Sequence, residues 1–592
     1  MVTEIPMKTS EKKKHLDAAL DEGLKESFPA SDPVAISFLK PVEIACGGDL
    51  SAFAEYAGKK RASKTASRKG KVEQDVPRVD KGSSRQEIEL KLEIAGKHVT
   101  QLIKRMPLRN YLIGRASKEV ITSAYFDTPD FWLRRHGLSL RLRQSNSGWV
   151  QTLKTCDVPQ AGMYRRGEWE GSVAEPAFDF IALRKMVGPH QGLKRLLRNE
   201  LALNAIFTTR VTRTTWNLKL PTGDEIEFSL DQGTIERDDL SEPISEVELE
   251  LKSGEPEHLF DCALQLVDAI PMQVGNLSKS ARGYLLCTPP QSTEAIAAGT
   301  PNLRNRMTVE EGCKAIVADC ALQIEGNSIA LIQGACEEAL HQMRVGLRRL
   351  RSALALFGRF ASPPPGMEDE LAWLEEKLGP ARDWEVFSHS TLDIVEVPAP
   401  EDAGIAHLRH AAIDVASAKR KQAVSAVQSV RFTRLILTLA RWLACVSWSS
   451  TVEKQWKHKL GGSLPRFAAD CIAREQHRVR RCHKHLRNEE PILQHKFRIA
   501  TKNLRYATEF FQSLYPNKEL DDYLGSLAAM QDELGLSNDK MVAEGFLQQL
   551  AEEREDLRPS IGFARGFLIA KGNKVDSNLW KHLASMKPKM QK

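Results

Sequence analysis

Charged side chains alternate with aliphatic ones in the middle third of the chain, and this pattern is the one most able to do chemistry. In residues 87–94 (EIELKLEI) each odd-numbered position is charged and each even-numbered position is aliphatic. Side chains of an extended strand point alternately to opposite faces, so the segment is predicted to be a strand with one charged face. Related alternation recurs in five later segments, which are 138–143, 166–170, 213–219, 225–231 and 246–252.

These strands carry acidic and basic residues on the same predicted face. One such strand would normally turn its charges to solvent, but six strands with charges of both signs favour a different arrangement. Closing the sheet into a barrel with its charges inward gives a polar lumen. The aliphatic faces would then pack outward against helices predicted at residues 97–112 and 256–270.

A lumen with acidic and basic rows has a defined chemical use. Arg and Lys bind the oxygens of a polyanion, and Arg can do so through two hydrogen bonds at once. Carboxylates repel phosphate unless a hard divalent cation such as Mg²⁺ or Mn²⁺ lies between them. The rows therefore indicate a metal–polyphosphate complex. The sequence shows no Ser-His-Asp or Cys-His arrangement and no GxxxxGK[ST] loop.

The spacing of Glu87, Glu89 and Lys91 resembles the ExExK signature of the CYTH, or triphosphate tunnel metalloenzyme, superfamily. Further matches follow in the family's order between Gln86 and Cys287. They are the YFDT segment 125–128, the LxLRxR segment 138–143, Leu153-Lys154, Arg166-x-Glu168, Leu230-Asp231, the acidic segment 246–250 and Ser278-Lys279.

The resemblance implies roles for individual residues. The metal ligands would be Glu87, Glu89, Glu246, Glu248 and Glu250. The phosphate-binding residues would be Lys91, Arg141, Arg143, Lys154, Arg166, Arg213 and Lys279. Lys91, Glu168 and Asp231 would take part in catalysis: Glu168 would orient a basic neighbour or a metal-bound water, and Asp231 would support the metal or position the water. For any single basic residue, a structural ion pair inside the barrel is the alternative. Arg165 and Arg210 have the opposite strand parity and are excluded.

The last part of the chain contains an internal repeat at helical spacing. Residues 341–351 match residues 495–505, and the LGPARD segment 378–383 matches the LGLSND segment 534–539. The repeated basic positions fall on one helical face in each copy. They are His341, Arg344, Arg348 and Arg351, then His495, Arg498, Lys502 and Arg505. Converging faces would form a groove for an extended polyanion; a solvated face and metal chelation by the histidines are the alternatives.

These repeated motifs resemble the CHAD domain, an α-helical domain named for its conserved histidines. The resemblance implies inorganic polyphosphate binding by both basic sets together with Arg382, and it also allows association with polyphosphate granules. Asn538 stands in the second copy where the first has Arg382, so the charge differs at that point.

The 592 residues therefore divide into four parts. We expect a mostly disordered head with a basic linker at 1–82, a CYTH tunnel domain at 83–288, a linker at 289–304 and a CHAD domain at 305–592. The fold class is α+β: an antiparallel β-barrel with surrounding helices, followed by an all-α duplicated helical bundle. The 10 Cys include no C-x-x-C pair, which favours reduced thiols. We expect a cytoplasmic protein, because no apolar segment follows the basic N-terminus and the apolar stretch at 435–448 is too short and polar to span a bilayer.

The predicted function is metal-dependent hydrolysis of tripolyphosphate to diphosphate and phosphate, with the helical domain binding polyphosphate. One alternative is a non-catalytic polyphosphate-binding or granule-associated protein. Another is a nucleoside, thiamine or RNA triphosphatase or an adenylate cyclase of the same superfamily. Nucleic-acid binding is not favoured, because few aromatic residues interleave the basic helical faces. The sequence carries no signal for the oligomeric state, the preferred metal or the chain length of the substrate.

Overall fold

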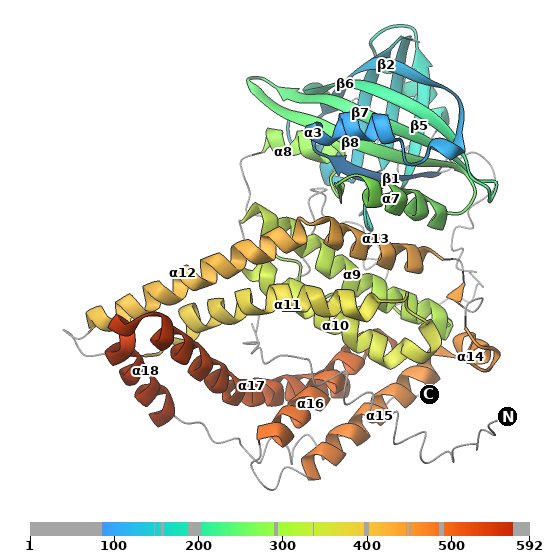
Figure 1. The fold of residues 1–592 in the computed structure, drawn as a ribbon. Helices are drawn as coiled ribbons and strands as arrows, with labels where there is room; N and C mark the ends of the chain where they lie inside the picture. The colour runs from blue at the N-terminus through green and yellow to red at the C-terminus, as the bar shows by residue number, and fades with distance from the viewer. Residues whose placement is uncertain are drawn as a thin grey trace, which may run out of the picture.

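The computed structural model describes residues 86–146, 148–155, 159–186, 203–288, 294–334, 337–395, 402–445, 447–448, 452–484 and 491–571. The head predicted at residues 1–82 lies outside the described residues. The described chain forms a β-rich part and a larger helical part (Figure 1). The expected change from strands to long helices is therefore observed.

The β-rich part is an antiparallel barrel. Eight strands close in the order β5-β4-β3-β2-β6-β7-β8-β1, with β1 pairing back to β5, and the short β9 extends the pairing along β1. The strands are β1 (Gln86–Ile94), β2 (Leu112–Asp127), β3 (Leu138–Ser145), β4 (Gly148–Thr155), β5 (Met163–Val173), β6 (Asn204–Lys219), β7 (Glu225–Arg237), β8 (Leu240–Ser253) and β9 (Met272–Val274).

The barrel has its charged faces inward, as the alternation predicts. Cross-strand register sets opposite charges side by side: Lys91 faces Glu248, and Arg213 faces Asp231. The opposite faces of the same strands carry buried aliphatic side chains that pack beneath two helices. These helices are α3 (Gly96–Arg105) and α7 (Glu257–Ala269).

Helix α7 matches its predicted range closely, but α3 is shorter than predicted. It ends at Arg105 because Met106 takes a left-handed conformation immediately before Pro107. A residue that precedes proline is disfavoured in the helical region, since the proline ring would clash with it. The remaining short helices of the barrel are α4 (Trp132–Arg135), α5 (Phe180–Met186), α8 (Lys279–Cys287) and the 3-10 turn η2 (Arg109–Tyr111).

The helical part confirms the duplication. Helix α10, with the first basic motif, packs on α11, while α16, with the second, packs on α17. The two motif helices also contact each other, and Ser352 Oγ lies 3.2 Å from Asn503 Oδ1 at that contact. The helices are α9 (Val309–Gln333), α10 (Glu338–Ala361), α11 (Met367–Val386), α12 (Asp402–Val427), α13 (Val430–Ala444), α14 (Lys454–Leu460), α15 (Leu464–Lys484), α16 (Pro491–Phe511), α17 (Lys518–Glu553) and α18 (Arg558–Ala570). The shorter turns are the π-helical η3 (Phe387–Thr391) and the 3-10 turns η6 (Gln512–Leu514) and η7 (Glu555–Leu557).

Within the described residues, α9 is long and apolar enough to cross a membrane by length and composition alone. Of its most apolar window, 67% is buried inside the protein. A buried core helix can have the same length and apolar composition, so these properties are only weak support for a membrane span by α9. The apolar stretch noted at residues 435–448 falls partly in α13, whose inner face is buried as well.

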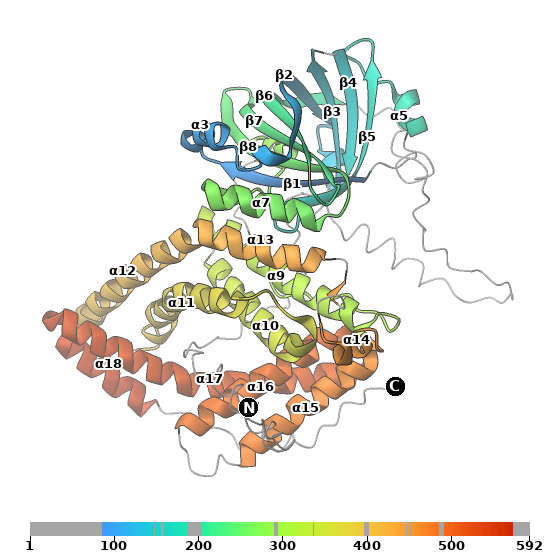
Figure 2. The same ribbon diagram turned by 45° about the vertical axis from the view of Figure 1, so that its right-hand side comes forward.

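The barrel and the helices share one hydrophobic core. Helix α7 lies between β1 and α13 in both views (Figures 1 and 2). Buried residues form one continuous cluster from Leu90 in the barrel through Leu266 of α7 to Leu435 of α13. Arg441 of α13 pairs with Asp261 of α7 across this interface. The two domains are therefore packed as one unit.

The described part of the predicted linker is held against the helices. Ile296 exchanges two hydrogen bonds with the Asn327 side chain, at 3.0 and 2.8 Å. The Gly299 carbonyl accepts a hydrogen bond from Arg349 at 3.0 Å. These contacts fix the path of the chain between the two domains.

Candidate active site

The barrel encloses a cavity of about 1140 Å³ lined by polar and charged side chains from all eight strands and from α8. Every tunnel residue predicted from the sequence lines this cavity except Glu246. Glu246 is fully buried and contacts lining residues instead. Arg165 and Arg210 do not line it, which confirms the parity argument that excluded them.

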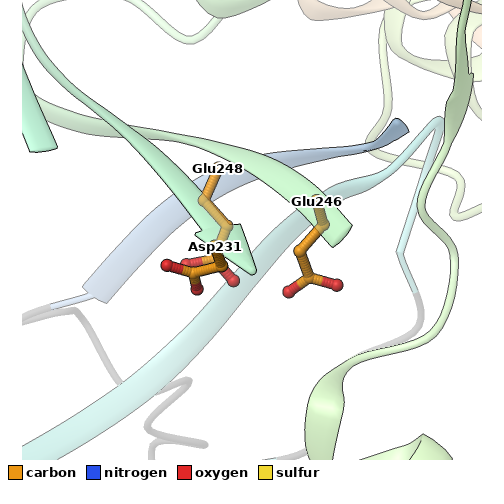
Figure 3. Close-up of side chains that lie close together, drawn as sticks. All are labelled: Asp231, Glu246 and Glu248. Carbon is orange, nitrogen blue, oxygen red and sulfur yellow. The ribbon is translucent and has the colours of Figure 1, made fainter. Parts of the chain in front are cut away.

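Three carboxylates converge at one place in the tunnel wall: Asp231 of β7, and Glu246 and Glu248 of β8 (Figure 3). Asp231 is directly opposite Glu246 in the strand pairing, and Glu248 lies two residues along on the same face. One oxygen atom from each lies within 4.8 Å of the others. All three are buried. We call this group the acid trio.

Two lysines compensate much of the charge of the acid trio. Lys91 Nζ lies 2.8 Å from Glu246 and 2.6 Å from Glu248. Lys279 Nζ lies 2.6 Å from Asp231 and 2.9 Å from Glu248, and it also contacts Glu246. Burial alone would lower the pKa of both amines, but the surrounding carboxylates raise it well above the usual range. Both lysines are therefore charged at physiological pH.

Arg213 supplies the third cation. Its guanidinium binds Asp231 through two hydrogen bonds, of 2.8 and 2.6 Å, and also contacts Glu248. Burial alone would raise the pKa of Glu248, but the three cations outweigh it and hold that pKa well below the usual range. Glu248 is thus ionised over the ordinary pH range.

The acid trio has the properties of a divalent-cation site. Its donors are carboxylate oxygens, the ligands that Mg²⁺ and Mn²⁺ prefer. Glu246 Oε1 receives both lysines, whereas Glu246 Oε2 has no hydrogen-bond partner among the described residues, and the Arg282 guanidinium lies 3.6 Å from it. A buried carboxylate oxygen left in that state is costly. A bound divalent cation would give this oxygen a partner. The three carboxylates are therefore suited to hold Mg²⁺ or Mn²⁺.

A second ion-pair group lies on β1, β4 and β5. Glu87 accepts hydrogen bonds from Lys154 at 3.0 Å and from Arg166 at 2.7 Å. Arg166 also reaches Glu89 at 2.9 Å, and Glu168 pairs with Lys154 at 2.8 Å. Burial opposes ionisation of Glu87, but the two cations lower its pKa overall.

The five predicted metal ligands thus do not form one cluster. Glu246 and Glu248 lie in the acid trio together with Asp231, which the sequence had placed among the catalytic residues. Glu87 and Glu89 lie in the second ion-pair group. Glu250 is partly exposed and lies 2.7 Å from Lys252.

A third group contains Arg141 and Arg143 of β3 with Glu170 of β5. Both arginines contact Glu170, at 3.5 and 3.2 Å, and Thr152 donates a hydrogen bond to it at 2.9 Å. Burial would raise the pKa of Glu170, but the arginines lower it to about 2. Arg141 also lies 3.7 Å from Glu168, which links this group to the second one.

Sequence reasoning missed several lining residues. Glu170 has the same strand parity as Glu168, so the alternation could have identified it. Lys185 of α5 and Asn276, in the segment after β9, also line the cavity. Neither belongs to an alternating strand, and their positions depend on the packing of segments outside the barrel wall.

The first copy of the repeated basic motif faces helix α11. Arg344 donates 2.8 Å hydrogen bonds to the Gly379 carbonyl and to Asp383, and Arg351 pairs with Glu375. His341, Arg344 and Arg348 are buried, with exposed fractions of 5%, 5% and 8%. Arg382 lies 3.7 Å from Glu385. A simple solvated basic face is therefore ruled out for the first three residues.

The second copy shows a related arrangement. Arg498 is buried, and Arg505 pairs with Glu509 at 2.7 Å and with Gln531 of α17 at 3.4 Å. Lys502 is half-buried. Burial, together with Arg498 and Lys502, lowers the pKa of His495, which favours the neutral imidazole at pH 7. The side chains of Asn538 and Asp539 lie outside the described residues.

Comparison with known families agrees with both halves of the architecture. Residues 85–284 match the model of the CYTH domain, and residues 315–548 match the model of the CHAD domain. The chain joins a CYTH domain to a CHAD domain. The tunnel and its acid trio lie in the CYTH domain, and both basic motifs lie in the CHAD domain.

A curated relative is an inorganic triphosphatase from Haemophilus influenzae, which is 32% identical over 201 residues. The match covers 34% of this chain and 55% of the relative, so the chain spans about half of that protein's length.

Two solved structures are also similar. The CHAD domain from the plant Ricinus communis is 36% identical, covers 50% of this chain and 98% of its own, and has a TM-score of 0.45. A protein from Hippeastrum reported to have a dominant triphosphatase activity is 17% identical, covers 33% of this chain and 95% of its own, and has a TM-score of 0.25.

Proposed function

We propose that the tunnel hydrolyses inorganic tripolyphosphate to diphosphate and phosphate with the help of a divalent cation. The observation that carries this proposal is the acid trio, which lies beside buried cations in a closed lumen lined by further Arg and Lys. A tunnel meant only to bind anions would gain nothing from buried carboxylates. The CYTH domain and the triphosphatase relative support the same reaction class.

Asp231, Glu246 and Glu248 would hold the cation, and Mg²⁺ or Mn²⁺ suits their oxygen donors. When bound, the cation neutralises charge on the phosphate oxygens and polarises the phosphoanhydride. Lys91, Lys279 and Arg213 would exchange part of their contact with the acid trio for contact with phosphate oxygens.

The other two ion-pair groups would hold the rest of the substrate. Arg141 and Arg143 can each offer paired N–H donors to a phosphoryl group, as can Arg166. These fixed cations stabilise the charge that develops as the phosphoryl group is transferred. Glu168, which pairs with Lys154 and lies near Arg141, would keep these two cations oriented toward the lumen.

The lining favours an inorganic substrate over a nucleotide or thiamine ester. Among the described residues that line the tunnel, the aromatic rings are those of Tyr125, Tyr164 and Trp169. Their exposed fractions are 4%, 3% and 6%, so none presents an open face on which a base could stack. Tyr125 is stacked on Phe207, and Tyr164 lies under the Arg166 guanidinium.

We propose that the CHAD domain binds longer polyphosphate chains, with Arg351, Arg382, Lys502 and Arg505 as the more accessible members of the two basic motifs. Such binding would also allow a cytoplasmic protein to associate with polyphosphate granules. The duplicated pairing of Arg351 with α11 and of Arg505 with α17 supports a common role for the two copies.

The direct test measures phosphate release from tripolyphosphate, ATP, thiamine triphosphate and long-chain polyphosphate, each with Mg²⁺ or Mn²⁺. We expect tripolyphosphate to give the highest kcat/KM and a chelator to abolish the activity. Faster hydrolysis of ATP would overturn the substrate assignment. No hydrolysis of any substrate, with intact polyphosphate binding, would establish the non-catalytic alternative.

A further inference from the structure

A buried carboxyl group of the CHAD domain contacts a turn in the wall of the tunnel. Glu325 of α9 is 5% exposed, and its Oε2 accepts a hydrogen bond from the Ala161 N–H at 3.0 Å. Ala161 belongs to the tight turn that opens β5, closed by two hydrogen bonds between Gln160 and Met163. Ala161 and Gly162 both have positive φ, 52° and 73°. The turn's own bonds leave the Ala161 N–H for Glu325.

This turn is pressed against the backbone of Lys91. The Gly162 carbonyl accepts the Lys91 N–H at 2.9 Å. A Cβ atom at Gly162 would lie 2.5 Å from the Lys91 carbonyl oxygen, so no larger residue fits without a shift of the backbone. The Lys91 carbonyl accepts the Gly275 N–H on its other side at 2.9 Å. Lys91 is thus held between two loops.

The same turn also holds the segment that leads to Lys279. The Gly162 N–H donates to Asn276 Oδ1 at 3.1 Å, and Asn276 lies three residues before Lys279. Lys91 and Lys279 are the two amines that contact the acid trio. The backbone of Lys91 and the side chain of Asn276 therefore meet at one turn, and Glu325 attaches that turn to the CHAD domain.

A carboxyl group is energetically unfavourable at the buried position of Glu325. Burial raises its pKa to about 7, although the Ala161 N–H and the Asn276 side chain act in the opposite direction. Glu325 Oε1 has no hydrogen-bond partner within the part of the chain that the structure describes. No charged side chain contributes to this pKa among the described residues. The carboxyl group therefore carries a desolvation cost at this position, and its hydrogen bond to the Ala161 N–H offsets part of that cost.

We propose that Glu325 is a positioning residue for the tunnel, which fixes Lys91 and Lys279 against the acid trio through the 160–163 turn and Asn276. The proposal rests on the proposed function, because it assigns the CHAD domain a part in the same site. The attachment is rigid because α7 and α13 pack in the core that both domains share. The CHAD domain thus contributes a residue that positions the tunnel lysines, in addition to packing against the barrel.

The first test compares Glu325→Ala, Glu325→Gln and a control, Asp319→Ala, in the full chain. Asp319 lies on the same helix and pairs with Arg349 at 3.0 Å inside the CHAD domain. We expect Glu325→Ala to lower kcat for tripolyphosphate on the order of tenfold through misplacement of the lysines. KM should change less, because Arg141, Arg143 and Arg166 still bind substrate. Glu325→Gln retains an acceptor oxygen and should restore most of the rate, and Asp319→Ala should leave it unchanged.

The second test does not depend on activity. Amide hydrogen exchange should accelerate in peptides that cover β1, the 160–163 turn and residues 272–279 in Glu325→Ala, but not in Asp319→Ala. Asn276→Ala should reproduce the change from the barrel side. Unchanged exchange in Glu325→Ala, or changed exchange with an unchanged kcat, would overturn the inference. A parent chain that does not hydrolyse tripolyphosphate at all would instead refute the proposed function.

Discussion

The tunnel and the duplicated basic helices place similar residues at regular spacing, yet the two regions use them differently. In the barrel, each row of charges faces the same enclosed cavity and meets charges from neighbouring strands. In the helices, much of the basic face is covered by α11, and Arg344 binds the Gly379 carbonyl and Asp383. Regularly spaced residues form a shared site only where the fold brings their rows to face one another.

The two helical copies also differ from each other. Arg351 pairs with an acid, Glu375, whereas Arg505 reaches the amide of Gln531 on the corresponding helix. Arg505 forms its ion pair with Glu509, which lies one turn along the same helix. The acid that pairs with this arginine thus comes from the neighbouring helix in the first copy and from the same helix in the second, while both arginines still contact the neighbouring helix.

The largest effect should come from the acid trio. Glu248→Gln removes one ligand and one negative charge, so tripolyphosphate hydrolysis should fall about a thousandfold, since metal catalysis contributes several kcal/mol. Steady-state kinetics across a metal titration would measure it. Glu225→Gln makes the same change at an exposed pair with Lys219 and should have no effect. Retained activity in Glu248→Gln would remove the basis for treating the tunnel as a metal site.

The cations of the tunnel should come next. Lys279→Ala removes an amine that contacts all three members of the acid trio, and kcat should fall about a hundredfold. The matched control is Lys219→Ala, at an exposed lysine at the end of β6 that pairs with Glu225 and does not line the cavity. An equal loss in both variants would show that the effect comes from general charge or folding, not from the lumen.

A smaller effect is expected in the helices. Arg351→Ala combined with Arg505→Ala should weaken long-chain polyphosphate binding about tenfold and reduce its dependence on salt, because fewer cations contact the polyanion. Binding assays at several salt concentrations would measure both. Arg431→Ala, at an exposed arginine that pairs with Glu370, is the control. Binding lost equally in the control would mean that the repeated motifs are not the binding surface.

The last prediction concerns stability and pH. Since the pKa of Glu325 is raised from 4.5 to about 7, the folded chain keeps a proton that the unfolded chain has lost between these values. The contribution of Glu325 to stability should therefore fall as pH rises from 4.5 to 7, by about 3 kcal/mol at most, and then level off. In Glu325→Gln this contribution to the slope of Tm against pH should disappear. Asp319→Asn should retain it, and the same slope in Glu325→Gln would assign it to another group.

The sequence by itself determined the parity of the strands and the existence of the repeat. Period-two alternation correctly placed Arg141 and Arg166 in the lumen and Arg165 outside it, because side-chain direction in a strand depends only on position along the chain. The repeated motif likewise identified α10 and α16 as equivalent helices.

Only the tertiary structure decided which of these residues meet. Asp231 joins Glu246 and Glu248 because of the register of β7 on β8, while Glu87 and Glu89 are drawn into a separate group with Arg166. The register of one strand against the next around a barrel cannot be read from the sequence of any single strand. The contact of Glu325 with Ala161 has no local signal either, since it joins residues 164 positions apart through the packing of two domains.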